Sequence, residues 1–219
     1  FARALVGRDY NPRLEVRCRT ERFGSDYGGW EVSVDGLHRG SVVYSFGIGE
    51  DASFDLGLIR RFGLTVHAFD PTPRSLRWVA LQQMPPEFVM HNYGVADREG
   101  LLAFYPPDNP EHVSHSLLHR DSTRERAIQV PMRRLSAIIQ ELGHDGIDLL
   151  KLDVEGAEYG VIEDLERGTV RPAQILAEFH HRLPGAGVEK TKAALAALQR
   201  MGYRVFAVSS RGNEYGFVR

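Results

Sequence analysis

The feature that most constrains the fold is an alternation of short apolar runs with helical patterns, which continues from residue 41 to the end of the chain. The runs have the length and the β-branched and aromatic content of buried strands, whereas the helical patterns place apolar side chains three or four residues apart. This order predicts an α/β fold with a mostly parallel sheet and helices on both faces. The expected strands are 41–46, 64–69, 87–92, 147–152, 174–179, 203–209 and 214–218, and the expected helices are 54–62, 75–83, 135–142, 157–165 and 190–201.

Both ends of the chain carry a different signal. Residues 203–209 and 214–218 alternate around Arg211-Gly212-Asn213, which predicts a closing antiparallel β-hairpin. Residues 14–20 and 30–34 also alternate and are separated by glycines, so we expect a small N-terminal β cap over 1–40, followed by the main domain over 41–219. Two extended pieces, 101–105 and 127–130, are expected around a long polar loop.

The composition excludes several classes of protein. Lys and Arg number 27 against 29 Asp and Glu among 219 residues, so a basic coat for nucleic acid is excluded. No apolar run has the length that spans a bilayer, which excludes an integral membrane protein. The single cysteine, Cys18, excludes an internal disulfide framework and a cysteine-based zinc site. We therefore expect a cytoplasmic protein. The chain begins at Phe1 without a Met, so we expect a piece upstream of it.

A glycine turn follows the first predicted strand of the main domain. Gly47-Ile48-Gly49-Glu50-Asp51-Ala52 matches G-x-G-x-x-A, and Asp70 ends the next strand about 20 residues later, where a carboxylate can accept both hydroxyls of a ribose. Glycine permits a tight turn and close approach of a ligand to the backbone. The pattern indicates a nucleoside site, and the alternative is an ordinary strand-to-helix turn.

Two acids distinguish between nucleoside ligands. Glu50 and Asp51 stand where a dinucleotide would place its pyrophosphate, which they would repel. A sulfonium and an ammonium group would be acceptable there, which favours S-adenosylmethionine over NAD. An NAD-dependent oxidoreductase remains the alternative enzyme, and a binding module without catalytic activity is the third interpretation of the function.

The fourth predicted strand ends in a run of charged residues. Lys151 and Asp153 lie two apart and therefore on one side of the strand, whereas Glu155 and Gly156 form the following turn. Charged residues at the tip of a buried strand need partners. Glu158 falls in the first turn of the next helix, where a helix-capping role accounts for it.

With the glycine turn, Asp70 and this charged run, the chain resembles the FkbM family of S-adenosylmethionine-dependent methyltransferases. The resemblance covers residues 41–219, and K-x-D-x-E-G-x-E is its most specific part. It implies a Rossmann-like class I methyltransferase fold with a seven-stranded sheet, and methyl transfer, commonly to a hydroxyl oxygen of a sugar, small-molecule or natural-product acceptor. Many members carry Glu at the position of Asp70. The segments that carry the resemblance are VYSFGIGED at 43–51, VHAFDPTP at 66–73, LKLDVEGAE at 150–158, ILAEFHHR at 175–182 and EYGFV at 214–218.

The family implies where the cofactor lies. The two glycines would face its methionine and ribose, Asp70 would hold the ribose hydroxyls, and Asp153 would lie near the methionine end. The segment 92–97 would hold adenine, with Asp97 accepting from its amino group. The expected cofactor-binding residues are Gly47, Gly49, Glu50, Asp70, Asn92, Val95, Asp97, Asp153 and Glu155.

The expected catalytic residues are His180, Glu178 and Asp153. Glu178 and His180 share one side of a strand end, next to Asp153 on a neighbouring strand, and could form a general-base pair in which Glu178 orients His180. His suits this role because its ordinary pKa is near neutral. A hydrogen-bonded structural cluster is the alternative, and a divalent cation is a third possibility. We expect no metal.

Two loops remain open in their interpretation. The polar segment 109–119 contains His112, His115 and His119 and could contact the acceptor or simply be solvated. Tyr27-Gly28-Gly29-Trp30 could be a flap over the methionine end of the cofactor or a plain hairpin turn. We expect a small-molecule or glycan acceptor as the partner, and the oligomeric state does not follow from the sequence.

Overall fold

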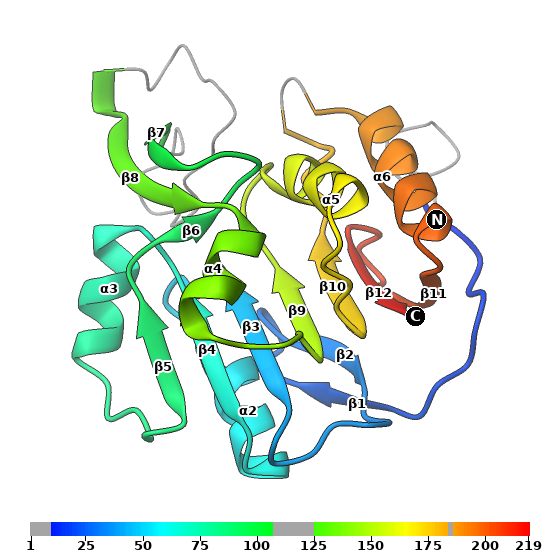
Figure 1. The fold of residues 1–219 in the computed structure, drawn as a ribbon, viewed down its shortest axis with the longest axis horizontal. Helices are drawn as coiled ribbons and strands as arrows, with labels where there is room; N and C mark the ends of the chain where they lie inside the picture. The colour runs from blue at the N-terminus through cyan, green and yellow to red at the C-terminus, as the bar shows by residue number, and fades with distance from the viewer. Residues whose placement is uncertain (1–9, 107–124, 184–185) are drawn as a thin grey trace.

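The computed structural model describes residues 10–106, 125–183 and 186–219. A central seven-stranded sheet has the order β11-β12-β10-β9-β3-β4-β5 and runs through the whole molecule (Figure 1). The predicted mostly parallel sheet is therefore confirmed. Its strands are β3 (Val42–Phe46), β4 (Thr65–Phe69), β5 (Phe88–His91), β9 (Leu149–Leu152), β10 (Gln174–Glu178), β11 (Arg204–Val208) and β12 (Glu214–Val218).

The direction of the strands places the site. β3 pairs in parallel with both β4 and β9, β9 pairs in parallel with β10, and β4 pairs in parallel with β5. β12 is antiparallel to both β10 and β11. The carboxyl ends of β3, β4, β9 and β10 therefore meet at one edge of the sheet, where open α/β sheets bind their ligands.

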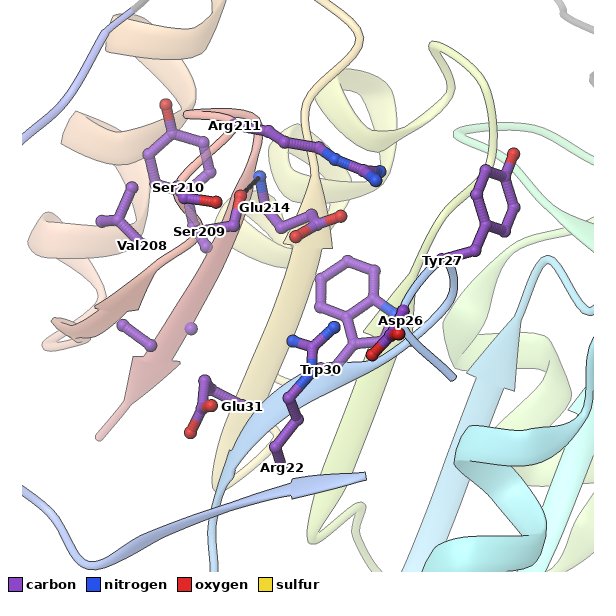
Figure 2. Close-up of a pocket in the computed structure, with 13 residues that line it drawn as sticks. Arg22, Asp26, Tyr27, Trp30, Glu31, Val208, Ser209, Ser210, Arg211 and Glu214 are labelled. Atoms are coloured by element: carbon purple, nitrogen blue, oxygen red, sulfur yellow. Dashed lines mark hydrogen bonds between the residues drawn. The ribbon is translucent and has the colours of Figure 1, made fainter. Parts of the chain in front are cut away.

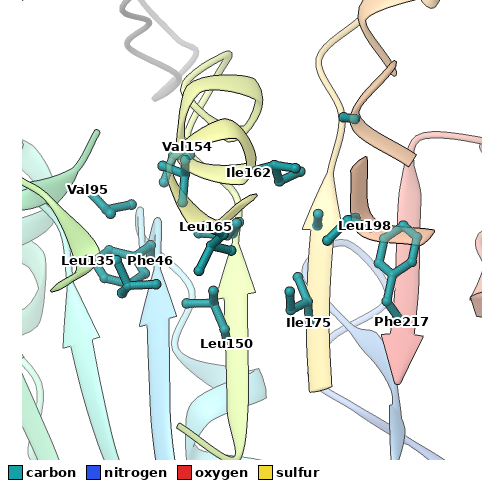
Figure 3. Close-up of a cluster of buried hydrophobic side chains, with 14 of the residues drawn as sticks. Phe46, Val95, Leu135, Leu150, Val154, Ile162, Leu165, Ile175, Leu198 and Phe217 are labelled. Carbon is teal, nitrogen blue, oxygen red and sulfur yellow. The ribbon is translucent and has the colours of Figure 1, made fainter. Parts of the chain in front are cut away.

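Three helices cover one face of the sheet and bury the larger apolar cluster (Figure 3). The strands supply every second side chain to this cluster, such as Leu150 and Leu152 from β9 and Ile175 from β10. Ile162 and Leu165 come from α5, and they pack at the same periodicity that predicted this helix. The three helices are α4 (Leu135–Leu142), α5 (Glu158–Arg167) and α6 (Val188–Arg200).

The opposite face is covered by α2 (Ser53–Phe62), α3 (Pro73–Ala80) and a separate two-stranded sheet of β1 (Thr20–Phe23) and β2 (Trp30–Ser33). The buried amide of Gln174 in β10 fixes this hairpin: it accepts from the Ser33 N–H at 2.8 Å and donates to the Ser33 carbonyl at 3.0 Å. The first strand was expected over 14–20, but it begins at Thr20. Residues Glu15 and Val16 instead donate to the carbonyl of Val205, because the edge of β11 offers them free acceptors.

A second small sheet follows the main one, with the order β6-β8-β7. It contains the two extended pieces that the sequence predicted, but only the first of them, β7, is an edge strand, because the second, β8, lies between β6 and β7. Its strands are β6 (Gly94–Val95), β7 (Gly100–Phe104) and β8 (Ile128–Arg133). In the part of the chain that the structure describes, no helix combines the length and the apolar character needed to cross a membrane.

Candidate active site

The glycine turn after β3 uses its two glycines differently. Gly47 has φ +84°, and a Cβ there would lie 1.8 Å from the carbonyl oxygen of Asp153, so this glycine is required by the close approach of the chain after β9. Gly49 has φ +58°, and a Cβ there would meet nothing within 4 Å. The space above Gly49 is thus open to a ligand, which fits a cofactor lying on this turn.

Asp70 lies at the end of β4 as predicted, but its carboxylate is fully engaged. One oxygen accepts from the backbone N–H groups of Ile48 and Gly49, at 3.2 and 3.0 Å. The other accepts from the N–H and the hydroxyl of Thr72, at 2.9 and 2.6 Å. Asp70 therefore shapes the glycine turn, and a ribose hydroxyl would bind it only by displacing one of these donors. Its role toward ribose stays a prediction.

Glu50 and Asp51 both have partners on the protein. Glu50 lies at the surface in an ion pair with Arg74 at 2.8 Å, and this hydrogen bond lowers the pKa of the Glu50 carboxyl. Asp51 accepts from the Ser53 N–H at 2.8 Å and from the Ser25 hydroxyl at 2.6 Å, so it caps the start of α2 and holds the β1–β2 loop. The charge of Glu50 is thus compensated by Arg74, which weakens its part of the electrostatic argument against a pyrophosphate, whereas the partners of Asp51 are neutral donors.

The expected adenine segment lies beyond the end of β5. Asn92 is exposed, whereas Val95 in β6 is fully buried in the core, so its side chain packs against protein rather than facing a ligand. Asp97 is exposed, lies 3.9 Å from Arg98 and packs against the backbone of Gly160 in α5. The contacts of this segment with adenine remain predictions.

His180, just after β10, is held by a buried carboxylate. Its Nδ1 lies 2.8 Å from Oε1 of Glu158, whose side chain is 0% exposed. Glu158 also accepts from the N–H groups of Val154 and Gly156, at 3.0 and 2.9 Å. The interpretation of Glu158 as a helix cap alone was therefore wrong. The orienting partner expected for His180 was Glu178, which lies 3.9 Å from Nε2, too far for a hydrogen bond.

The other ring nitrogen faces three more carboxylates. His180 Nε2 lies 3.4 Å from Glu155 and 3.9 Å from Asp153. Glu178 accepts from the Asn213 amide at 2.5 Å, which turns it toward the β11–β12 hairpin. The expected trio of His180, Glu178 and Asp153 is thus brought together, and Glu155 joins it from a turn in which it adopts φ +52°.

The burial and charges of this cluster shift the pKa values of His180 and Glu178. Burial opposes a charged imidazolium, but the carboxylates of Glu158 and Glu155 outweigh this cost and raise the pKa of His180 well above its usual range. Burial, and then the negative charge of Asp153, raise the pKa of Glu178 to about 8. The carboxylates therefore favour the charged imidazolium of His180, and rising pH favours its neutral form.

The same cluster has the donor set of a cation site. Asp153, Glu155 and His180 each offer one ligand atom, and these atoms lie within 4.8 Å of one another. Oxygen and imidazole ligands in this combination suit a divalent ion such as Mn²⁺. A metal on Nε2 and a proton taken by Nε2 exclude each other, so the two interpretations of His180 are alternatives.

The sequence analysis expected Lys151 to have partners, which it finds at the glycine turn, but it missed the buried Asp55. Lys151 donates to the carbonyl of Gly47 at 2.8 Å, lies 3.7 Å from Asp153, and stands over the ring of Trp30. Asp55 in α2 is 2% exposed, and burial raises its pKa to about 6. The signal was available, because Asp55 precedes Leu58 and Ile59 by three and four residues and so lies on the apolar face of its helix.

The two loops left open in the sequence have different outcomes. Tyr27 and Trp30 belong to the β1–β2 hairpin, in which Trp30 is buried and Tyr27 is 73% exposed. This hairpin lies beside the glycine turn, since Ser25 bonds Asp51. The histidines of segment 109–119 lie outside the described residues.

Comparison with known proteins identifies the domain. The sequence model described as "Methyltransferase FkbM domain" matches residues 41–205, three quarters of the chain. A "31-O-demethyl-FK506 methyltransferase FkbM" of Streptomyces tacrolimicus is 30% identical over an alignment of 178 residues, which covers 66% of this chain and 67% of that protein. A "Probable methyltransferase-like protein 24" of Rattus norvegicus is 29% identical over 217 residues.

The coverage of these relatives differs. The rat protein is matched over 92% of this chain, but this chain spans only 50% of its length. Among solved structures, fibrillarin of Aeropyrum pernix with bound S-adenosyl-L-methionine aligns at a TM-score of 0.48 and 10% identity, over 95% of this chain and 85% of that one. A likeness this weak supports no assignment. The match to the family model does, and the chain belongs to the FkbM methyltransferase family, whose cofactor is S-adenosylmethionine.

Proposed function

We propose that the domain transfers the methyl group of S-adenosylmethionine to a hydroxyl oxygen, with His180 as the general base. The observation that carries this proposal is the contact of His180 Nδ1 with the buried carboxylate of Glu158. This contact fixes the ring and leaves Nε2 directed toward the carboxyl ends of β9 and β10. A base in this position can take the hydroxyl proton as the oxygen attacks.

The residues of the cluster would have different roles in the reaction. S-adenosylmethionine supplies a methyl group that its sulfonium already activates. Glu158 keeps the proton on Nδ1 and stabilises the imidazolium after proton transfer, while Asp153 and Glu155 line the space in front of Nε2. Because these carboxylates raise the pKa of His180, the neutral base is abundant only above neutral pH. We therefore expect an alkaline optimum.

The cofactor would lie over the glycine turn. Gly49 leaves open space there, and Gly47 keeps the turn against Asp153, so the methionine end would face the acid–histidine cluster. Asp70 would act mainly by holding the turn in shape. Glu50, Asn92, Val95 and Asp97 stay as candidate contacts, Val95 through its backbone.

The acceptor is proposed by class. The Streptomyces relative is named for methylation of an oxygen of FK506, which supports oxygen as the methylated atom. A hydroxyl of a sugar or of a natural product is the acceptor we propose. An NAD-dependent oxidoreductase is the competing function. Thermal unfolding with S-adenosylhomocysteine and with NAD tests it, because only the true ligand raises the midpoint.

A pair of histidine variants tests the base. His180→Asn removes the basic nitrogen while keeping a polar side chain, and His38→Asn changes an exposed histidine as the control. We expect His180→Asn to bind S-adenosylhomocysteine in calorimetry like the unmodified protein, but to lose about 10²–10⁴-fold in methyl transfer to a panel of hydroxylated acceptors. Unchanged turnover of His180→Asn would remove His180 from the mechanism.

A further inference from the structure

A polar cavity lies between the N-terminal hairpin and the β11–β12 hairpin, outside the glycine turn. Its volume is about 370 Å³. Trp30 and Tyr27 line it from the β1–β2 side, and Arg211 and Glu214 line it from the opposite hairpin (Figure 2). Neither the family match nor the reasoning on the cofactor accounts for this cavity.

The cavity shares a wall with the acid–histidine cluster. Glu214 is the Cα partner of Glu178 across the β10–β12 ladder, and the neighbouring Asn213 donates to the Glu178 carboxylate at 2.5 Å. On the other side, partial burial and then the charges of Asp153 and Glu178 raise the pKa of the Tyr27 hydroxyl. A molecule in the cavity would therefore reach the groups that face His180.

The lining determines which molecules fit. Small-molecule sites measure about 300–1,000 Å³, so a cavity of this size has room for a small molecule and not for a large macrocycle. The walls carry charges of both signs, which suit the donors and acceptors of neighbouring hydroxyl groups better than an apolar chain or a single strong charge. The polar side chains are Arg22, Asp26, Glu31, Ser209, Ser210, Arg211 and Glu214.

The rim adds an aromatic surface. Tyr27 is 73% exposed and lines the cavity. Figure 2 shows its ring standing apart from the other lining side chains. An exposed ring beside hydrogen-bonding groups suits the apolar face of a sugar, whose hydroxyls point the other way.

We propose that this cavity holds the methyl acceptor and that the acceptor is a neutral polyhydroxylated molecule of the size of one or two sugar rings. This inference rests on the proposed methyl transfer. It assigns the N-terminal hairpin to acceptor binding, with Tyr27 as a platform for the ring and Arg211 and Glu214 as partners of its hydroxyls.

Saturation-transfer NMR with free hexoses and their methyl glycosides tests the proposal in the presence of S-adenosylhomocysteine. The variants are Tyr27→Ala, Arg211→Ala and Glu214→Gln, with Leu81→Ala, an exposed apolar residue at the end of α3, as the control. We expect saturation transfer to at least one sugar, weakened about 2- to 10-fold by Tyr27→Ala and unchanged by Leu81→Ala. No transfer to any sugar, or equal transfer in Tyr27→Ala, would overturn the proposal.

The charge variants test the neutral class. A neutral polyol loses a partner in either variant, so both Arg211→Ala and Glu214→Gln should weaken binding. With glucuronate as the probe, stronger binding in Glu214→Gln together with no loss of hexose binding would show that the cavity takes an anion, and would contradict the proposal.

Turnover separates this inference from the proposed function. Sugar binding that depends on Tyr27, without any methyl transfer, would refute the proposed function and leave the cavity as a sugar site. Methyl transfer to an apolar hydroxyl compound that is unaffected by Tyr27→Ala would support the function and refute the assignment of the cavity.

Discussion

Gly47 and Gly49 lie two residues apart in one turn, yet alanine at the two positions should destabilise the protein to different extents. Both have positive φ, so a Cβ costs roughly 1–2 kcal/mol at either position. At Gly49 nothing else opposes the methyl group, and the gain from a stiffer unfolded chain offsets about 0.5 kcal/mol of this cost. We therefore expect Gly49→Ala to lower the free energy of unfolding by about 1 kcal/mol.

At Gly47 the same methyl group meets the carbonyl oxygen of Asp153 at 1.8 Å, and neither atom belongs to a side chain that can rotate away. Overpacking of this kind costs about 1–3 kcal/mol more. Gly47→Ala should therefore lose about 2–5 kcal/mol of stability. Urea unfolding followed by circular dichroism measures both values.

Gly49→Ala, the more stable of the two variants, should nevertheless bind the cofactor more weakly. If the cofactor fills the space above Gly49, the new methyl group overpacks that contact, and the affinity for S-adenosylhomocysteine falls about 5- to 150-fold in calorimetry. Undiminished affinity in Gly49→Ala would refute the placement of the cofactor on this turn. Wild-type stability of Gly47→Ala would refute the packing argument.

Four further predictions concern ionisable groups. Glu158→Gln removes the carboxylate that raises the pKa of His180, so the acid limb of kcat/KM should move to lower pH, and a limb that stays in place would contradict the role of Glu158. Chelation by EDTA should leave turnover unchanged, and added Mn²⁺ should inhibit by occupying Nε2, whereas activation by Mn²⁺ would favour the metal interpretation. Burial lowers the pKa of His67 to about 4, so its contribution to stability is present above its unfolded pKa of about 6.5 and is lost as the pH falls toward 4. After allowance for partial exposure this loss is about 1–2 kcal/mol, and His67→Gln should flatten the pH dependence measured by urea unfolding. Lys151→Met leaves the carbonyls of Phe46 and Gly47 without their buried donor and should cost about 1–3 kcal/mol in the same assay.

Much of the sheet follows from local pattern. β3 begins one residue after its predicted start, and α4 has its predicted bounds because Gly143, at φ +68°, ends it in the left-handed conformation. Both signals lie within a few residues of the element that they define. The first strand was misplaced for the converse reason: residues 14–18 alternate like a strand, but their partner is β11, almost 190 residues away.

The candidate site likewise combines features that the sequence predicts with contacts between distant segments that it does not. The sequence brings Asp153, Glu178 and His180 together, because the carboxyl ends of adjacent parallel strands meet. It does not reveal that Glu158 holds His180, since this contact depends on how α5 packs against β10 rather than on strand order. The sequence motif also does not reveal that four donors bind the Asp70 carboxylate, because a motif specifies residue types and not their hydrogen bonds.

The side chain of Gln174 joins the N-terminal hairpin to the sheet by imitating a peptide group. One amide donates to and accepts from the two backbone atoms of Ser33, as a neighbouring strand would do. These two bonds add to the other attachments of the hairpin, which are the bond of Ser25 with Asp51 and the packing of Trp30 and Val32 in the apolar cluster. Because both bonds go to backbone atoms of Ser33, this joint does not depend on the side chain at that position, and the wall opposite the β11–β12 hairpin can vary there in sequence without losing it.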